Sequence, residues 1–419
     1  MDVPGVLRSQ TVVVENGVIT ALGPTTTVSI PAEAQVIDGS GKYLLPGFAD
    51  MHMHLWRPAT LRLLLAHGVT LARDMNGNPT FLAWREDIEL GRRSGPRLVV
   101  ASRIFEGTPP PEQADVIITE GRIIVDDSAS AADSVQSQVS QGYDLIKVYN
   151  NLNEDAYRGI VSEARRLGVP VVGHVPFSVG LSGAFEAGQS TIEHLRGYVL
   201  ESIPADAPDQ PAADFRSRLV AWRHADTARL SDLAKETAEI GAWIVPTLVT
   251  SFDLLPLDRV SELTERPGWQ RCMRGSRSDP VATRAEIPYF AVMSDEDFAA
   301  TQEGVRVQKR LVRLLHEAGA GVLVGTDQSP RGFAFHWELE ELVDAGLPPW
   351  DVLHAATLGA AQYLGQADDY GSVTQGKVAE FVLLEANPID DIRNTKRIAA
   401  VFAGGRWIEA AELESEKCL

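Results

Sequence analysis

The stretch that most constrains this chain is Pro46-Gly-Phe-Ala-Asp-Met-His-Met-His54. An apolar run precedes it, a Pro-Gly pair opens it, and two histidines separated by one residue end it. Residues i and i+2 of a strand point to the same face, so we expect His52 and His54 to project together. Two adjacent imidazoles are half of a metal site, although a strand end with two solvent-facing histidines has the same pattern.

Composition narrows the possible partners. The chain has 419 residues, enough for a barrel of about 250 residues and a smaller domain. Lys and Arg number 38 against 57 Asp and Glu, which gives a net charge of −19. This surplus repels phosphate backbones and anionic membranes, so we expect no nucleic-acid and no membrane partner. A small-molecule substrate is the expected partner, and a homo-oligomer is compatible with the sequence.

The cysteines restrict the kind of metal site. Only Cys272 and Cys418 occur, which excludes a disulfide framework and thiolate metal ligands. Any metal must therefore be held by nitrogen and oxygen. The N-terminus carries no basic segment followed by an apolar one, and no long apolar run is present. The sequence as given predicts a cytoplasmic protein, unless a signal peptide has been removed.

Both ends of the chain carry short strand signals. Residues 11–19 read as a strand, an Asn-Gly turn and a second strand, and further strand material continues to Val36-Ile37. Near the other end, residues 371–374, 379–384 and 398–402 also read as short strands. Because neither end can bury a core alone, we predict one small β-sandwich domain built from residues 1–45 plus 366–419.

The middle of the chain, residues 46–365, alternates short apolar runs with helical patterns. Helix candidates with apolar residues at i, i+3 and i+4 include 154–167, 230–240 and 305–318. The strand candidates after the opening stretch are 69–73, 97–101, 145–149, 169–174, 190–194, 242–248 and 321–327. Eight strand–helix repeats predict an α/β fold of the (β/α)8 TIM barrel type, with the active site at the C-terminal strand ends.

Polar side chains occur at or near four of these strand ends, namely Lys147, His174, His194 and Asp327. In a barrel they converge with the histidine pair on one mouth. Each histidine alone has an ordinary explanation as a satisfied polar residue, and Asp327 as a turn or cap residue. Lys147 is harder to explain, because buried ammonium groups are rare unless paired, and carbamylation by CO2 would make it an anionic bridging ligand. Together these residues predict a metal site.

Two connections are too long for plain links, 196–227 and 250–300, and loops of this length are often lids or binding loops. A surface excursion unrelated to the site is the alternative. The second connection could present cations and aromatic rings to a ligand, through Trp269, Arg271, Arg274, Arg277, Arg284 and Tyr289.

The chain resembles the metal-dependent amidohydrolase superfamily, specifically its imidazolonepropionase-like and Xaa-Pro dipeptidase (prolidase-like) branch, which includes ochratoxin-type amide hydrolases. The resemblance covers nearly the whole length. It rests on the split β domain, the opening stretch, the polar strand ends, Gly-Val-Thr-Leu-Ala-Arg-Asp at 68–74 and Gly-Lys-Val-Ala-Glu-Phe-Val-Leu-Leu-Glu-Ala-Asn-Pro at 376–388. The first strand usual in the family's β domain is not apparent, as expected if the sequence is truncated or has a different start.

The resemblance implies two divalent metal ions and a ligand for each position. His52, His54 and Asp327 would hold the more buried ion, His174 and His194 the more exposed one, and carbamylated Lys147 would bridge both. Imidazolonepropionase lacks the lysine and uses one ion, so Lys147 favours the binuclear, dipeptidase-like form. We expect zinc, although such nitrogen and oxygen ligands also accept manganese, cobalt or iron.

The implied reaction is cleavage of an amide C–N bond by a hydroxide shared between the metals, with Asp327 moving the proton to the leaving nitrogen. Aromatic and basic residues in the strand-end loops would suit an apolar side chain carrying a carboxylate, although such aromatics often only pack under loops. The candidates for substrate binding are Tyr149, Arg196, Tyr198, Arg331 and His336.

We therefore predict a dipeptide or an N-acyl amino acid with a hydrophobic or prolyl C-terminal residue as substrate. A cyclic amide hydrolase or aminohydrolase of imidazolonepropionase type would use the same metals with a differently shaped pocket. A non-catalytic scaffold on the same fold would be expected to lose ligands, and this chain keeps them all.

Overall fold

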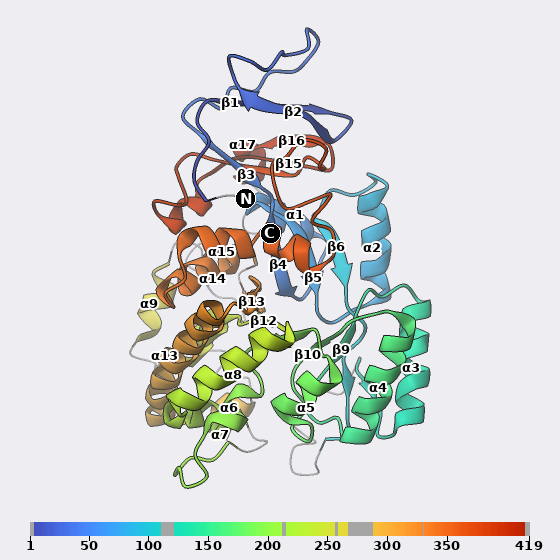
Figure 1. Cartoon of the computed structure of the whole chain (residues 1–419), viewed down its shortest axis with the longest axis vertical. Coiled ribbons are helices and arrows are strands. Elements are labelled where there is room, and N and C mark those ends of the chain that lie inside the picture. The colour runs from blue at the N-terminus through green and yellow to red at the C-terminus, as the bar shows by residue number, and fades with distance from the viewer. Residues whose placement is uncertain are drawn as a thin grey trace.

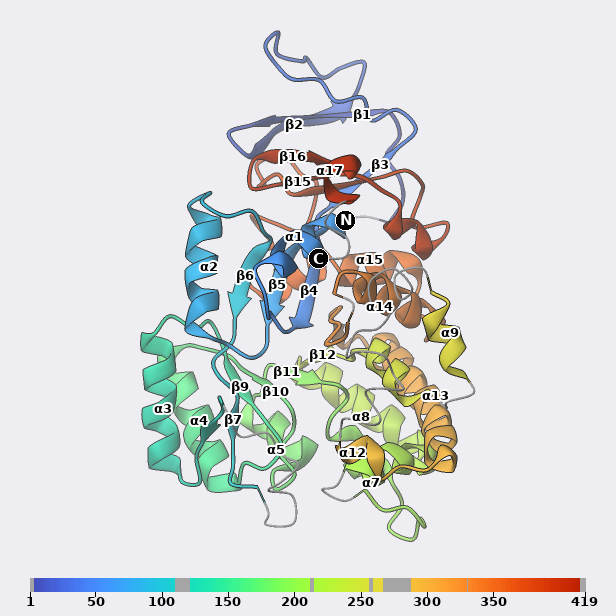
Figure 2. The same cartoon turned by 180° about the vertical axis from the view of Figure 1, so that it is seen from behind.

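A computed structural model describes residues 4–109, 121–211, 215–255, 259–266, 288–329 and 331–414, and every structural statement concerns these residues. Figure 1 and, from behind, Figure 2 show an elongated molecule. A projecting hairpin forms one end, a small antiparallel sheet lies beneath it, and parallel strands with helices around them make up the rest.

The parallel strands follow one another in chain order, except that β9 pairs with β7 and β8 lies beyond β7 at the edge of the sheet. One sheet has the order β4-β5-β6, and the other the order β13-β12-β11-β10-β9-β7-β8. Backbone contacts join them twice: Ala101 bridges to Leu145 beyond β6, and Met51 N donates to Val324 O at 2.8 Å beyond β13. The strands are β4 (Phe48–Met53), β5 (Val69–Asp74), β6 (Arg97–Val100), β7 (Phe105–Glu106), β8 (Ile123–Ile124), β9 (Ile146–Val148), β10 (Val171–Gly173), β11 (Thr191–Glu193), β12 (Trp243–Val245) and β13 (Gly321–Val322). The predicted α/β fold is confirmed, and the arrangement of the parallel strands is consistent with a (β/α)8 barrel.

Alternate residues of the parallel strands face two different cores. Phe48, Ala72 and Ile192 pack with the surrounding helices in the largest buried cluster. Their neighbours on the other face, such as Leu71 and Val172, join a separate cluster with contributions from both parallel sheets. This division is expected for strands that enclose a packed interior and are covered by helices outside.

Helices and 3-10 helices (η) alternate with these strands. They are α1 (Ala59–Ala66), α2 (Pro79–Glu89), α3 (Ser128–Ser140), α4 (Glu154–Leu167), α5 (Gly180–Ala187), α6 (Tyr198–Ser202), α7 (Phe215–Ala221), η2 (Trp222–His224), α8 (Thr227–Ile240), η3 (Leu248–Leu254), α9 (Val260–Thr264), α12 (Pro288–Ala291), α13 (Asp295–Ala318), α14 (Phe333–Asp344), α15 (Pro349–Ala355) and α16 (Leu358–Tyr363).

Local capping signals set the helix bounds. The predicted helix 154–167 is confirmed as α4, where the Asn153 side chain accepts from Ala156 N and Gly168 ends the helix at φ 71°. The predicted helix 305–318 starts earlier, at Asp295. A capping box between Ser294 and Asp297 fixes that start inside the segment expected to be a long connection.

The two ends of the chain meet in the composite sheet, which has the order β16-β15-β14-β3. Pro46 of β3 pairs with Phe381 of β14, and Lys42 Nζ donates to Glu385 Oε2 at 2.6 Å. The elements are β3 (Tyr43–Pro46), β14 (Phe381–Leu384), η5 (Ile392–Lys396), β15 (Ile398–Ala403), β16 (Arg406–Glu409) and α17 (Ala410–Glu414). The domain boundaries placed at residues 45 and 365 stay a prediction.

The predicted hairpin is confirmed as β1 (Gln10–Glu15) and β2 (Val18–Pro24). Asn16 and Gly17 both have positive φ, at 51° and 78°, as a type I′ turn requires. Ile19 of the hairpin is buried together with Ala379 and Phe381, so this two-stranded sheet packs on the composite sheet.

Some strand expectations were wrong. Residues 25–37 form no strand, and Val36 is 67% exposed. Residues 371–374 form none either, and β7 and β8 were not foreseen. Of the residues noted in the second long connection, Trp269, Arg271, Arg274, Arg277 and Arg284 lie outside the described residues.

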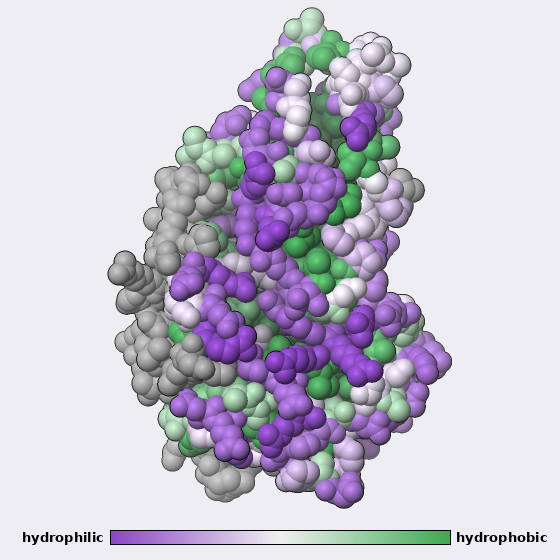
Figure 3. Space-filling view, turned by 90° about the vertical axis from the view of Figure 1, so that its left-hand side faces the viewer, coloured by the Kyte–Doolittle hydropathy of each residue, from purple (hydrophilic) through white to green (hydrophobic). Residues whose placement is uncertain are grey.

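The surface is mixed in character. Figure 3 shows hydrophilic residues over much of one face, with hydrophobic residues between them. Isolated exposed apolar side chains are ordinary for globular proteins. Within the described ranges, no helix combines the length and the apolarity that a membrane span needs.

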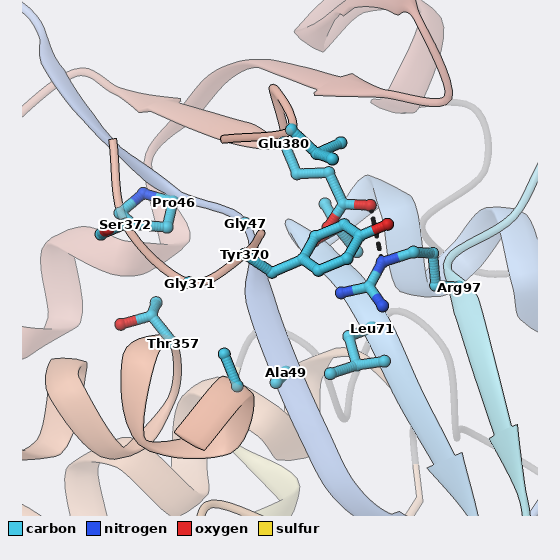
Figure 4. A pocket seen from close by; sticks show the side chains of 13 residues that line it. Pro46, Gly47, Ala49, Leu71, Arg97, Thr357, Tyr370, Gly371, Ser372 and Glu380 are labelled. Carbon is cyan, nitrogen blue, oxygen red and sulfur yellow. Dashed lines mark hydrogen bonds and ion pairs between the residues drawn. The ribbon is translucent and has the colours of Figure 1, made fainter. Parts of the chain in front are cut away.

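A crevice lies where the composite sheet meets the N-terminal ends of β4, β5 and β6. Arg97 Nε donates to Glu380 Oε1 at 2.9 Å, and the Tyr370 ring lies 3.5 Å from the Arg97 guanidinium carbon (Figure 4). Thr70 Oγ1 also donates to Glu380, at 3.2 Å. These contacts join the composite sheet to the parallel strands at the end opposite the predicted mouth.

Gly325 is required where the chain beyond β13 passes β4. A Cβ at this position would lie 2.7 Å from both Cβ and N of His52. We expect Gly325→Ala to lower the free energy of unfolding by about 1–3 kcal/mol, measured by denaturant titration. Gly39→Ala is the control, since nothing lies within 4 Å of its added Cβ. An equal loss in both variants would contradict the close contact as the cause.

Candidate metal centre

Three predicted ligands meet at one point. Each of His52, His54 and Asp327 offers a ligand atom, and these atoms lie within 4.8 Å of one another. Nε2 of His54 is 3.2 Å from Oδ1 of Asp327, and Nε2 of His52 is 3.8 Å from its Oδ2. The histidine pair of the opening stretch therefore faces a carboxylate from the far end of the barrel sequence.

Backbone contacts between β4 and the chain beyond β13 hold this group together. Thr326 N and Asp327 N both donate to His52 O, at 2.9 and 2.8 Å. The buried Asp50 carboxylate accepts from Thr326 Oγ1 at 2.8 Å and from Thr326 N at 3.1 Å. A register shift between Asp50 and Met53 marks a β-bulge, a feature that re-aims side chains at the ends of strands.

Of the other two predicted histidines, His194 approaches the same carboxylate and His174 lies beside His194. Nε2 of His194 lies 3.6 Å from Oδ2 of Asp327. The His194 ring centroid is 4.5 Å from that of His52 and 4.9 Å from that of His174. Thus the ends of β4, β10 and β11 deliver their histidines to one mouth, as the barrel prediction requires.

Lys147 lies in β9 beside this cluster. Its side chain is 1% exposed, and burial lowers the pKa of its amine to about 8, although the charges of Glu193 and Asp327 act in the opposite direction. Gly173 makes room for it, because a Cβ there would lie 3.0 Å from Cδ of Lys147. A buried amine with a lowered pKa is more often neutral, and only the neutral amine can take up CO2.

The second ring nitrogen of three histidines is hydrogen-bonded. Nδ1 of His52 lies 2.6 Å from Oε2 of Glu193, and Nδ1 of His174 lies 2.7 Å from Oδ1 of Asn150. Nδ1 of His194 lies 2.6 Å from the Thr247 hydroxyl. Carboxylate and carbonyl oxygens accept, so Nδ1 donates in the first two and Nε2 keeps its lone pair. This is the tautomer that binds a metal through Nε2.

Burial determines the charge of these histidines. It lowers the pKa of His52 to about 4, and it holds the pKa values of His174 and His194 well below their ordinary range. Burial alone would raise the pKa of Asp327, but His54 and His52 outweigh it and hold this pKa well below its usual value. At neutral pH the imidazoles of His52, His174 and His194 are therefore neutral, and the Asp327 carboxylate is ionised.

Backbone strain is concentrated at this mouth. Positive φ angles occur at His194 (57°), Leu195 (56°), Thr247 (48°) and Asp327 (47°), which follow three successive parallel strands. Such conformations are uncommon for residues other than glycine and cluster at functional sites. The strain supports the view that these side chains are held in place for chemistry.

Comparison with known proteins places the chain in a family. The Amidohydrolase family profile matches residues 43–408, which is most of its length. The chain belongs to the amidohydrolase family. The resemblance predicted from the sequence is thereby confirmed.

Three individual proteins that this amidohydrolase resembles share 30% or less of their residues with it over the aligned part. Ochratoxinase of Aspergillus niger is 30% identical over 136 residues, which is 30% of this chain and 28% of that protein. A Bifidobacterium longum protein assigned as a prolidase has 26% identity and a TM-score of 0.68, over 97% of this chain and 92% of that one. Bottromycin amidohydrolase has 27% identity and a TM-score of 0.70, over 97% and 84%.

Three predicted substrate-binding residues lie near the mouth. The half-buried Tyr149 ring stacks on His174 with centroids 4.0 Å apart, and the Arg122 guanidinium carbon lies 4.4 Å from the Tyr149 centroid. The charge of Arg196 contributes to the lowered pKa values of the nearby ligands. Arg331 donates to the backbone carbonyls of His54 and Gln328, so it also braces the loop after Asp327.

Tyr198 and His336 are not brought to the mouth. The Tyr198 side chain is fully buried in α6, and its hydroxyl lies 2.7 Å from Thr237 Oγ1 of α8. His336 is buried in α14, where Nδ1 lies 3.0 Å from Thr395 Oγ1 of η5. Both pack between elements of the outer layer, so we leave them out of the proposed substrate pocket.

The residues that support the ligands were not predicted from the sequence. Glu193 and Arg73 are 0% exposed, and Arg73 Nη2 donates to Glu193 Oε1 at 2.9 Å. A signal was present, because opposite charges occurred near the ends of two strand candidates, at residue 73 of 69–73 and at residue 193 of 190–194. Asn150 and Thr247 carried no comparable signal, since polar residues after strands are common.

The residues at the mouth fit a metal ion. The donor set consists of imidazole nitrogen and carboxylate oxygen, which suits divalent transition metals. Nδ1 of His54 is buried and has no hydrogen-bond partner in the part of the chain that the structure describes. An unpaired buried polar atom beside three imidazoles and a carboxylate indicates a site built for a ligand.

The lowered histidine pKa values have a consequence for stability. Between pH 6.5 and 5, an unfolded histidine takes up a proton that folded His174 refuses, so the free energy of unfolding falls as the pH falls. In the chelator-treated enzyme we expect wild type to lose about 2 kcal/mol more than His174→Asn over this range, measured by denaturant titration. Identical pH slopes in the two proteins would contradict a neutral buried His174.

Proposed function

We propose that this amidohydrolase is a metal-dependent enzyme that hydrolyses an amide C–N bond in a dipeptide or an N-acyl amino acid with a hydrophobic or prolyl C-terminal residue. The observation that carries the proposal is the convergence of His52, His54 and His194 on the Asp327 carboxylate. Two similar structures support it: one is assigned as a prolidase, and the other is bottromycin amidohydrolase.

In this proposal His52, His54 and Asp327 would hold one ion, His174 and His194 would hold a second, and carbamylated Lys147 would be a ligand shared by both. Two divalent ions, which we propose to be zinc, would supply a deprotonated water at neutral pH and polarise the scissile carbonyl. The hydrogen bonds at Nδ1 of His52, His174 and His194 keep their Nε2 atoms directed at the site.

Asp327 is the proposed acid–base residue. Its carboxylate is ionised at neutral pH and lies within 3.8 Å of three imidazoles, so it can accept a proton from the attacking water and deliver it to the leaving nitrogen. Without this transfer the amine would have to leave as an anion, which is unfavourable in water.

Binding of the substrate is assigned to the rim of the mouth. The half-buried Tyr149 is assigned to an apolar group of the substrate, and the guanidinium groups of Arg196 and Arg331 are assigned to its carboxylate. A C-terminal amino acid presents both an apolar side chain and a carboxylate. This match supports dipeptides and N-acyl amino acids as the substrate class.

The bridging role of Lys147 predicts the metal content. Elemental mass spectrometry of protein purified without chelator should give about two divalent ions per wild-type chain and clearly fewer for Lys147→Ala. About one ion per chain, indifferent to the substitution, would contradict the binuclear site and favour a mononuclear cyclic-amide hydrolase. Lys235→Ala, on the exposed surface of α8, is a control that should not change the content.

The proposed role of Asp327 predicts that its substitution lowers turnover while metal binding is at least partly retained. We expect Asp327→Asn to reduce kcat on a hydrophobic N-acyl amino acid at least 100-fold, because general acid–base catalysis contributes about 10²–10⁴-fold. At least one metal ion should stay bound, as measured on the same samples. Unchanged turnover would rule out the role.

A further inference from the structure

Glu193 is a buried carboxylate with three donors around it. It accepts from Nδ1 of His52 at 2.6 Å, from Nη2 of Arg73 at 2.9 Å and from Oγ1 of Thr191 at 2.5 Å. The side chains of Glu193 and Arg73 are both 0% exposed. An ionised carboxylate in such a place requires compensation by charge and hydrogen bonds, and here it receives both.

Arg73 contacts the carboxylate and the backbone beside His52 at once. Its Nε donates to Met51 O at 2.5 Å, directly before His52 in β4. Its Nη1 lies 3.4 Å from the Tyr363 hydroxyl, and its guanidinium carbon lies 5.4 Å from the centroid of that ring. Arg73 therefore fixes Glu193 and the strand that carries His52 in one arrangement across β4, β5 and β11.

The partner of His52 differs from those of the other histidines. His174 has an amide oxygen at Nδ1 and His194 has a hydroxyl, and both of these partners are neutral. A carboxylate at Nδ1 makes the opposite nitrogen, Nε2, a stronger ligand, whereas a neutral acceptor does so less. Among these hydrogen-bonded histidines, the structure gives the anionic partner to the one in the strand β4.

We infer that Glu193, held by Arg73, is a positioning residue for His52: it keeps the proton on Nδ1, directs Nε2 to the mouth and strengthens binding of the more buried metal ion. This inference rests on the proposed function in so far as His52 is a metal ligand. In this inference Glu193 acts through His52 and is not itself a metal ligand.

The chain offers a matched control in the Arg97–Glu380 pair. Its Nε–Oε1 distance is 2.9 Å, equal to the distance between Arg73 and Glu193, and Glu380 is also largely buried. This pair lies at the crevice of Figure 4, at the opposite end of the strands, and contacts no predicted ligand. Glu380→Gln therefore removes a comparable ion pair without touching the metal centre.

The test compares Glu193→Gln and Glu380→Gln with wild type, each as purified enzyme loaded with zinc. Zinc affinity is measured by competition with a chromogenic chelator, and the Tm is measured with zinc and after chelator treatment. We expect the zinc dissociation constant of Glu193→Gln to rise about 10–100-fold, with a smaller zinc-induced rise in Tm. Glu380→Gln should lower the Tm equally with and without zinc and keep the wild-type affinity.

An unchanged zinc affinity in Glu193→Gln, or an equal loss in Glu380→Gln, would overturn the inference. If Glu193→Gln does not fold, Glu193→Asp replaces it, since it keeps the charge beside Arg73 and shortens the reach toward His52. A weaker zinc affinity in Glu193→Asp would support the inference, and wild-type affinity would overturn it. Failure of wild type to bind zinc, cobalt or manganese would instead overturn the proposed function.

Discussion

The buried ion pair between Arg73 and Glu193 is the interaction on which the mouth depends. Neither charge has access to water, so each is tolerated only because the other is present. Removal of one partner from such a pair commonly costs about 3–5 kcal/mol, because the remaining charge is left uncompensated. The pair joins three parallel strands, and His52 and Lys147 project beside it. The candidate ligands at the strand ends are thus supported by a buried ion pair between the parallel strands.

Local signals made much of the fold predictable. The Asn16-Gly17 turn fixes the first hairpin by its positive φ angles, and the caps Asn153 and Gly168 fix the bounds of α4. The strand-end residues were predictable as a group for a topological reason. Parallel strands of a barrel end on one side, so polar residues at their ends meet without any information on their contacts.

Other features depend on partners distant in sequence and could not be predicted. The role of the Glu193 carboxylate depends on Arg73, which β5 places beside it, and no local sequence pattern predicts that pairing. Tyr198 looked like a rim residue because it follows His194 closely, yet α6 turns its ring into the helical layer. The start of α13 at Asp295 was hidden within a segment whose composition resembles a loop.

The pairing of β3 with β14 constrains how the protein is made. Lys42 and its partner Glu385 are separated by 343 residues, so β3 leaves the ribosome long before its neighbouring strand exists. At about 5–20 residues per second, this strand waits roughly 15 to 70 seconds with its edge unpaired. Unpaired edges invite pairing with other chains, so β3 is exposed to such pairing until β14 has been synthesised.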